Sequence, residues 1–141
     1  GSKLVDRLSN ICKVKTYDPL DNSEDELDNL LGHADIVSLH MPLLPETKLF
    51  FNQKKLSLLK DGALLINTSR GPIIDEDALY NELIKGRIYS AIDVFWQEPY
   101  QGKLTNSNVK NIYLTPHVAS NCKEFLEGLA NDFLDFHNIL I

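Results

Sequence analysis

The sequence predicts an α/β protein built on a Rossmann-like, doubly wound parallel sheet. Short apolar runs alternate with amphipathic helical segments through the whole chain. Each run is almost continuously apolar, which is typical of parallel strands covered on both faces by helices. With 141 residues, of which 43% are hydrophobic and 24% charged, the chain has the size and composition of one globular domain.

The first half of the sequence alternates helix and strand. Its predicted elements are a helix over 1–10, a strand over 13–17, a helix from Ser23 to Gly32 and a strand over 35–40. Apolar residues recur at helical spacing in the first segment, and polar and β-favouring residues alternate in the second. Ser23 and Glu26 have the S-x-x-E form of a capping box, which predicts the start of the second helix. Pro42 ends the last strand, because proline cannot donate a hydrogen bond to a sheet.

The second half continues the alternation. Its predicted elements are a helix over 52–60, a strand over 63–67, a helix over 75–85, a strand over 88–94, a strand over 111–115 and a final helix beginning at residue 120 or 121. Gly62 and Gly86 separate the helices from the strands that follow them. Phe125, Leu129 and Phe133 recur on one face of the final helix.

Composition excludes several classes of function. The net charge is −6 and the lysines and arginines are scattered, which disfavours binding to nucleic acid. No apolar run approaches the ~18 residues that a membrane span needs, so we expect a cytoplasmic protein without a membrane partner. Cys12 and Cys122 lie in no CxxC or Cys/His cluster. We therefore expect both cysteines to be buried thiols, and we expect neither a metal site nor a disulfide framework.

Ligands of parallel α/β sheets bind at the carboxyl ends of the strands. The residues that follow the predicted strands are Asp18, Met41, Pro42, Thr68, Ser69, Arg70, Asp93 and His117. Asp18 has two interpretations: it binds the ribose hydroxyls of an adenosine, which favours NAD, or it forms an Asp-Pro turn. Gly1 lies at about the 20-residue distance expected for the last glycine of a dinucleotide-binding fingerprint, or it remains from an expression tag.

Three side chains at this edge have the chemistry for oxidising an alcohol. His117 can accept the hydroxyl proton near neutral pH, and Glu98 can orient its ring by a hydrogen bond to the second ring nitrogen. Arg70 can bind a substrate carboxylate through two hydrogen bonds and polarise the adjacent carbonyl. Taken singly, each has an ordinary interpretation: a structural histidine, a solvated glutamate and a surface arginine. Their common position at the mouth of one predicted sheet favours the catalytic interpretation.

Four motifs carry a resemblance to a known family. They are ADIVSLHMPLLPETK from Ala34, LLKDGALLINTSRGPIIDEDAL from Leu58, AIDVFWQEP from Ala91 and NIYLTPHVAS from Asn111. In this order they make nearly the whole chain resemble the D-isomer-specific 2-hydroxyacid dehydrogenases. The resemblance implies an oxidoreductase that transfers a hydride between NAD(H) and a small anionic D-2-hydroxy or 2-keto acid. It also implies a homodimer, with Arg70, Glu98 and His117 as the catalytic residues.

The resemblance also implies the cofactor site. Its predicted contacts are Asp18 at the adenosine ribose, Met41 and Pro42 near the adenine, Thr68 and Ser69 at a strand end, Asp93 at the nicotinamide amide and Ala119 beside His117. Gly1, Arg70 and His117 complete this set. His40, in an H-x-P turn, is expected to be structural.

The sequence departs from the family pattern in three ways. The family's central first strand and glycine-rich turn come before the helix that starts this sequence, and its substrate domain is built from both chain termini. We therefore expect residues 1–141 to be a partial NAD-binding domain, truncated at its N-terminal strand and inactive in isolation. Trp96 and Gln97 replace acidic residues often found before the equivalent of Glu98. The alternative function is a non-catalytic, NAD-sensing module, similar to transcriptional corepressors that use this fold to control oligomerisation.

Overall fold

A computed structural model describes residues 1–120 of the chain. Its helices and strands are, in order, α1 (Ser2–Leu8), α2 (Glu24–His33), β1 (Ile36–Leu39), α3 (Gln53–Leu58), β2 (Leu64–Asn67), α4 (Glu76–Ile84), β3 (Tyr89–Ile92) and β4 (Ile112–Leu114). Short 3-10 turns, η1 (Gly71–Ile73) and η2 (Lys103–Thr105), follow β2 and β3. In this part of the chain, no helix is long and apolar enough to cross a membrane.

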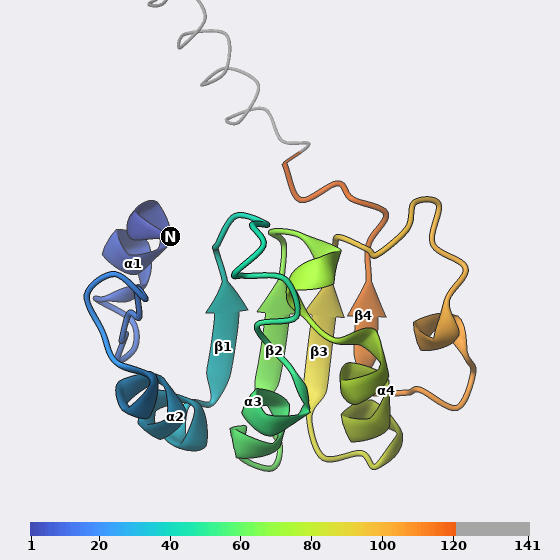
Figure 1. Cartoon of the computed structure of the whole chain (residues 1–141), viewed down its shortest axis with the longest axis horizontal. Helices are drawn as coiled ribbons and strands as arrows, with labels where there is room; N and C mark the ends of the chain where they lie inside the picture. Colours follow the sequence, from blue (N-terminus) through green and yellow to red (C-terminus); the bar gives the residue numbers. More distant parts are fainter. Residues whose placement is uncertain (121–141) are drawn as a thin grey trace, which may run out of the picture.

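The strands form one parallel sheet in the order β1-β2-β3-β4. All four arrows in Figure 1 point the same way, so the carboxyl ends of the strands meet along one edge, which we call the carboxyl edge. The predicted α/β class with a parallel, Rossmann-like sheet is confirmed.

The core lies between one face of the sheet and the helices α3 and α4, which lie in front of it in Figure 1. Leu65 and Ile92 of the sheet and Leu56 and Leu79 of the helices are almost fully buried there. The sequence predicts a sheet covered by helices on both faces, and the described residues show this cover only in part. Among residues 1–120, side chains of the other face such as Tyr113 remain more than half exposed.

Polar caps begin the helices as the sequence indicates. The capping box is confirmed: the Ser23 hydroxyl accepts from the backbone N–H of Glu26, and the Glu26 carboxylate accepts from that of Ser23. Asn52 caps α3 and Asp75 caps α4. The side-chain oxygen of each accepts a hydrogen bond from the backbone N–H three residues later. These caps satisfy donors that the first turn of a helix leaves unpaired.

Two predictions for the N-terminal part are wrong. Residues 13–17 form no strand, because β1 pairs only with β2 and no strand in the described part of the chain supplies 13–17 with a hydrogen-bonding partner. Cys12 is exposed, since it follows α1, a helix without buried residues. Cys122 and the predicted final helix lie outside the described residues.

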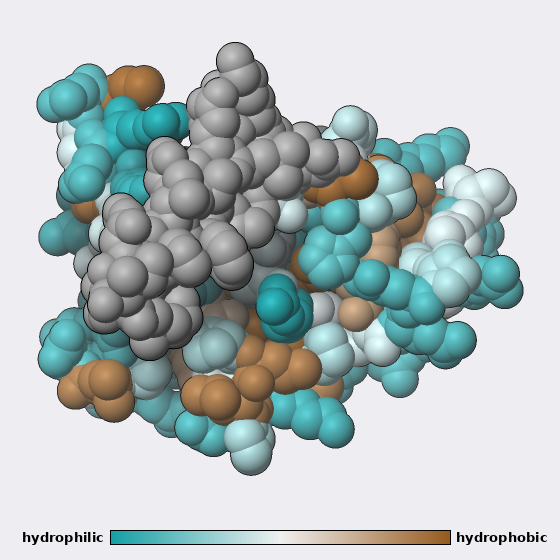
Figure 2. All heavy atoms as spheres, turned by 90° about the horizontal axis from the view of Figure 1, so that it is seen from above, coloured by the Kyte–Doolittle hydropathy of each residue, from teal (hydrophilic) through white to brown (hydrophobic). Residues whose placement is uncertain are grey.

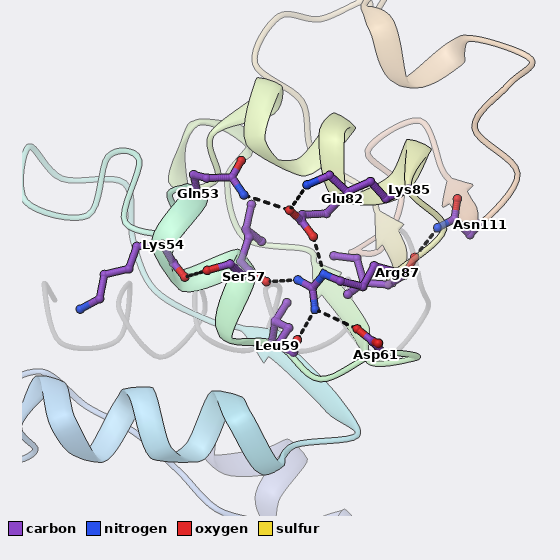
Figure 3. Close-up of polar contacts among 11 residues, drawn as sticks. Gln53, Lys54, Ser57, Leu59, Asp61, Glu82, Lys85, Arg87 and Asn111 are labelled. Atoms are coloured by element: carbon purple, nitrogen blue, oxygen red, sulfur yellow. Dashed lines mark hydrogen bonds and ion pairs between the residues drawn. The ribbon is translucent and has the colours of Figure 1, made fainter.

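An ion-pair network around the buried Glu82 side chain lies at the opposite end of the sheet (Figure 3). Glu82 of α4 accepts hydrogen bonds from Arg87 at 2.5 Å, Gln53 at 2.9 Å and Lys85 at 3.2 Å. Arg87 also donates to the carbonyl oxygens of Leu56 and Leu59 at the end of α3. The network therefore joins two helices to the start of β3 and gives the Leu59 carbonyl at the end of α3 a hydrogen-bond donor.

Candidate active site

The carboxyl edge brings the three predicted catalytic residues to one side of the molecule. Arg70 follows β2, Glu98 lies in the loop after β3, and His117 follows β4. Figure 2 looks onto this edge, where hydrophobic patches lie among hydrophilic side chains in the visible, described part. An edge of mixed polarity with charged side chains suits a small polar ligand.

Glu98 and His117 form a direct pair. The Nδ1 atom of His117 lies 2.9 Å from Oε1 and 3.1 Å from Oε2 of Glu98. Because a carboxylate only accepts hydrogen bonds, Nδ1 carries the proton in this contact, and Nε2 is left to exchange a proton with a ligand. Both side chains are a little under half exposed, at 44% and 45%, so a ligand can reach them.

The turn that carries His117 is organised by Asp93, which is 3% exposed. Its carboxylate accepts hydrogen bonds from the Thr115 hydroxyl at 2.5 Å and from the backbone N–H groups of Val118 and Ala119, each at 2.9 Å. Burial alone would raise the pKa of Asp93, but these hydrogen bonds and the nearby His117 hold that pKa below its ordinary value. An ionised carboxylate therefore anchors the turn and supports His117, whose φ of 56° lies in the left-handed region.

We expect Asp93→Asn to loosen this turn. An amide offers one acceptor oxygen where the carboxylate offers two, so the N–H groups of Val118 and Ala119 cannot both keep their partner. Hydrogen–deuterium exchange of the full-length protein should show faster exchange in a peptide covering 115–119. Asp6→Asn on the exposed face of α1 is the control, and equal exchange in both variants would contradict the anchoring role.

Asn67 organises the turn that carries Arg70. It is fully buried at the end of β2. Its amide nitrogen donates to the carbonyl of Arg70 at 2.9 Å, and its amide oxygen accepts from the N–H and hydroxyl of Ser69 at 3.0 and 2.8 Å. Arg70 itself is exposed and donates to the Ser69 carbonyl. Sequence reasoning missed Asn67 and Thr115, although a polar residue ending an apolar strand is a signal that could have singled out Asn67.

A cavity of about 450 Å³ opens beside Arg70. It is lined by Gly1, His40, Met41, Pro42, Leu43, Ser69 and Arg70. Its volume is in the usual range for small-molecule sites, and five of the predicted cofactor contacts meet in it: Gly1, Met41, Pro42, Ser69 and Arg70. His40, expected to be structural, lines the cavity as well and lies 2.9 Å from the Ser38 hydroxyl through Nε2.

The remaining predicted cofactor contacts do not line this cavity. Thr68, Asp93, His117 and Ala119 lie elsewhere along the carboxyl edge. Asp18 makes a turn, in which its side chain accepts from the N–H of Leu20 at 3.0 Å. Among the described residues, no group of three or more His, Cys, Asp or Glu side chains could hold a metal ion.

Comparison with known proteins gives consistent similarities. Residues 4–119 match the sequence model of the family described as D-isomer specific 2-hydroxyacid dehydrogenase, NAD binding domain. The chain is 36% identical over 121 residues to hydroxypyruvate reductase of Thermotoga maritima, covering 79% of this chain and 40% of that protein.

Two solved structures extend the comparison. D-lactate dehydrogenase from Aquifex aeolicus, complexed with NAD and lactic acid, is 32% identical with a TM-score of 0.66, covering 91% of this chain and 44% of that one. A D-isomer specific 2-hydroxyacid dehydrogenase from Xanthobacter autotrophicus, in complex with NADPH and MES, is 38% identical with a TM-score of 0.62, covering 67% and 40%. The chain thus spans less than half the length of each of these relatives.

Proposed function

Because the chain belongs to the D-isomer-specific 2-hydroxyacid dehydrogenases, as an NAD-binding domain, we propose that the full-length protein is an NAD-dependent oxidoreductase. Its reaction transfers a hydride between NAD(H) and C2 of a small anionic D-2-hydroxy or 2-keto acid. The observation that carries this proposal is the hydrogen-bonded Glu98–His117 pair, which lies at the same edge of the sheet as Arg70.

Each of the three side chains has one step in the proposed mechanism. Bound NAD+ would supply the hydride acceptor. His117 takes the hydroxyl proton of the 2-hydroxy acid through Nε2 as the hydride leaves C2, and it returns that proton to the carbonyl oxygen in the reverse direction. Glu98 stabilises the imidazolium that forms and fixes the ring through Nδ1. Arg70 binds the substrate carboxylate and polarises the adjacent carbonyl.

We propose that residues at or near the carboxyl edge bind the nicotinamide nucleotide. The proposed contacts are Gly1, Asp18, Met41, Pro42, Thr68, Ser69, Arg70, Asp93, His117 and Ala119. The cavity beside Arg70 has room for part of a nucleotide. Asp93 already receives three hydrogen bonds, so its contact with the nicotinamide amide would use the remaining acceptor site of its carboxylate.

Three further properties belong to the proposal. Residues 1–141 form the NAD-binding part of a two-domain enzyme whose substrate-selecting residues lie in another segment. The full-length protein acts in the cytoplasm and assembles as a homodimer. These proposals rest on family membership.

The test is an NADH oxidation assay of the full-length protein against a panel of 2-keto acids that includes hydroxypyruvate, glyoxylate and pyruvate. We expect turnover with at least one of them, and faster turnover with NADH than with NADPH. NADH binding without turnover on any member of the panel would contradict the proposal and favour the NAD-sensing module.

A further inference from the structure

The loop that carries Glu98 is fastened on both sides of that residue. Before it, the indole Nε1 of Trp96 donates to the carbonyl of Ile74 at 2.8 Å. After it, the ring of Tyr100 stacks on Phe95 with centroids 4.6 Å apart and planes at 16°, and it lies 6.1 Å from the ring of Trp96. We call Phe95, Trp96 and Tyr100 the aromatic clamp. Glu98 therefore lies in a short segment between two anchored aromatic residues.

The Tyr100 hydroxyl ties this loop to helix α4. It donates to Oε1 of Glu76, in the first turn of α4, at 2.6 Å and accepts from the backbone N–H of Leu104 at 3.1 Å. Burial raises the pKa of Tyr100, and the hydrogen bond to Glu76 raises it further. The phenol therefore stays protonated, so it can donate to Glu76 across the range of pH in which an enzyme works.

The same loop packs directly against the turn that carries Arg70. A Cβ atom added at Gly71 would lie 2.2 Å from the carbonyl carbon of Phe95 and 2.3 Å from its oxygen. Such distances mean that the two backbones are in contact and that only glycine fits between them. The aromatic clamp thus holds the Glu98 loop against the Arg70 turn as well as against α4.

We propose that Tyr100 and Trp96 are positioning residues that hold Glu98 against the ring of His117. This inference rests on the proposed function, in which Glu98 orients His117. In the described part of the chain, no hydrogen bond joins either residue to His117, and neither residue lines the cavity beside Arg70. We therefore expect their effect on the reaction to pass through Glu98.

The test compares Tyr100→Phe with the wild type in two backgrounds of the full-length enzyme. Phenylalanine keeps the stacking on Phe95 and removes both hydroxyl contacts. Hydrogen bonds to charged groups are stronger than those between neutral groups. Losing the bond to Glu76 should therefore loosen the loop that carries Glu98, and we expect kcat to fall by about tenfold. The dissociation constant of NADH should stay within about twofold, because the loop lines no part of the cavity. In a Glu98→Gln background, Tyr100→Phe should cost nothing further.

Several outcomes would overturn the proposal: an unchanged kcat, a weakened NADH affinity that accounts for the loss, or an equal loss with and without Glu98. Tyr89→Phe, on the exposed sheet face, is the matched control and should leave kcat unchanged. If Tyr100→Phe does not fold, Trp96→Phe removes the hydrogen bond to Ile74 on the other side of Glu98. It is then compared with the wild type with and without Glu98→Gln.

A second measurement does not need activity in the double variant. The Nδ1 signal of the His117 ring, which lies 2.9 Å from Glu98, can be followed by NMR in protein with isotope-labelled histidine. If the aromatic clamp positions Glu98, the chemical shift of this signal in Tyr100→Phe moves in the same direction as in Glu98→Gln. A chemical shift that stays at the wild-type value while kcat falls would overturn the proposal, because the loss would then arise elsewhere. Failure of the proposed function would appear differently, as absent turnover in the wild type.

Discussion

Replacing His117 by Gln in the full-length enzyme is expected to lower kcat by about 10²- to 10⁴-fold, the range typical of losing a general acid or base. Glutamine keeps a donor that can face Glu98, whose carboxylate lies 2.9 Å from Nδ1 in the wild type, but it cannot take up or release a proton in the reaction. NADH affinity should change much less, because the substitution leaves the cavity beside Arg70 intact. Steady-state assays and a fluorescence titration with NADH measure the two quantities separately.

His33→Gln is the control for this substitution. His33 lies in the last turn of α2, where Nδ1 is 2.8 Å from the carbonyl of Asn29, and it is far along the chain from every predicted catalytic residue. We expect this variant to retain wild-type kcat. Unchanged turnover in His117→Gln would remove His117 from the mechanism, and an equal loss of NADH affinity and kcat would make it a cofactor contact only.

The order of helices and strands could be predicted because it depends on local patterns. The capping box at Ser23 and Glu26 involves two residues three positions apart, and the apolar run that forms β2 needs no knowledge of its neighbours. Residues 13–17 show the limit of such patterns. Whether an alternating segment becomes a strand depends on another strand being beside it, and the sequence of the segment does not contain that information.

The catalytic part of the candidate site could be predicted from side-chain chemistry and from positions after predicted strands. Arg70, Glu98 and His117 have suitable side chains just after predicted strands, and the structure brings Glu98 and His117 into contact. The residues that hold the site could not be predicted in the same way. Thr115 and Tyr100 acquire roles only through contacts with Asp93 and Glu76, each more than twenty residues away.

The largest expected effect on stability comes from the network at the other end of the sheet. Glu82→Ala is expected to destabilise the fold by about 3 to 5 kcal/mol, the usual cost of removing one partner of a buried ion pair. The Glu82 side chain is 2% exposed, and its loss leaves Arg87, at 21% exposed, with only the distant and exposed carboxylate of Asp61. Gln53 loses its acceptor as well. Urea unfolding of the full-length protein measures the change through the midpoint of the transition.

Asp61→Ala provides a control on the same arginine. Asp61 is 86% exposed and 3.5 Å from Arg87, so solvent screens the pair and its removal should leave the midpoint unchanged. If both variants shift the midpoint equally, the burial of Glu82 does not matter to the stability of the fold.

The pH dependence separates charge from packing in this network. Burial alone would raise the pKa of Glu82, but the hydrogen bonds from Arg87, Gln53 and Lys85 hold it below its ordinary value of 4.5. A lowered carboxyl pKa contributes stability that is present above the ordinary value and is lost as the pH falls through the folded-state value. The difference between wild type and Glu82→Ala should therefore shrink as the pH falls below 4.5. A difference that stays constant into acid would mean that Glu82 stabilises the fold by filling space, and the ionised network would then contribute nothing.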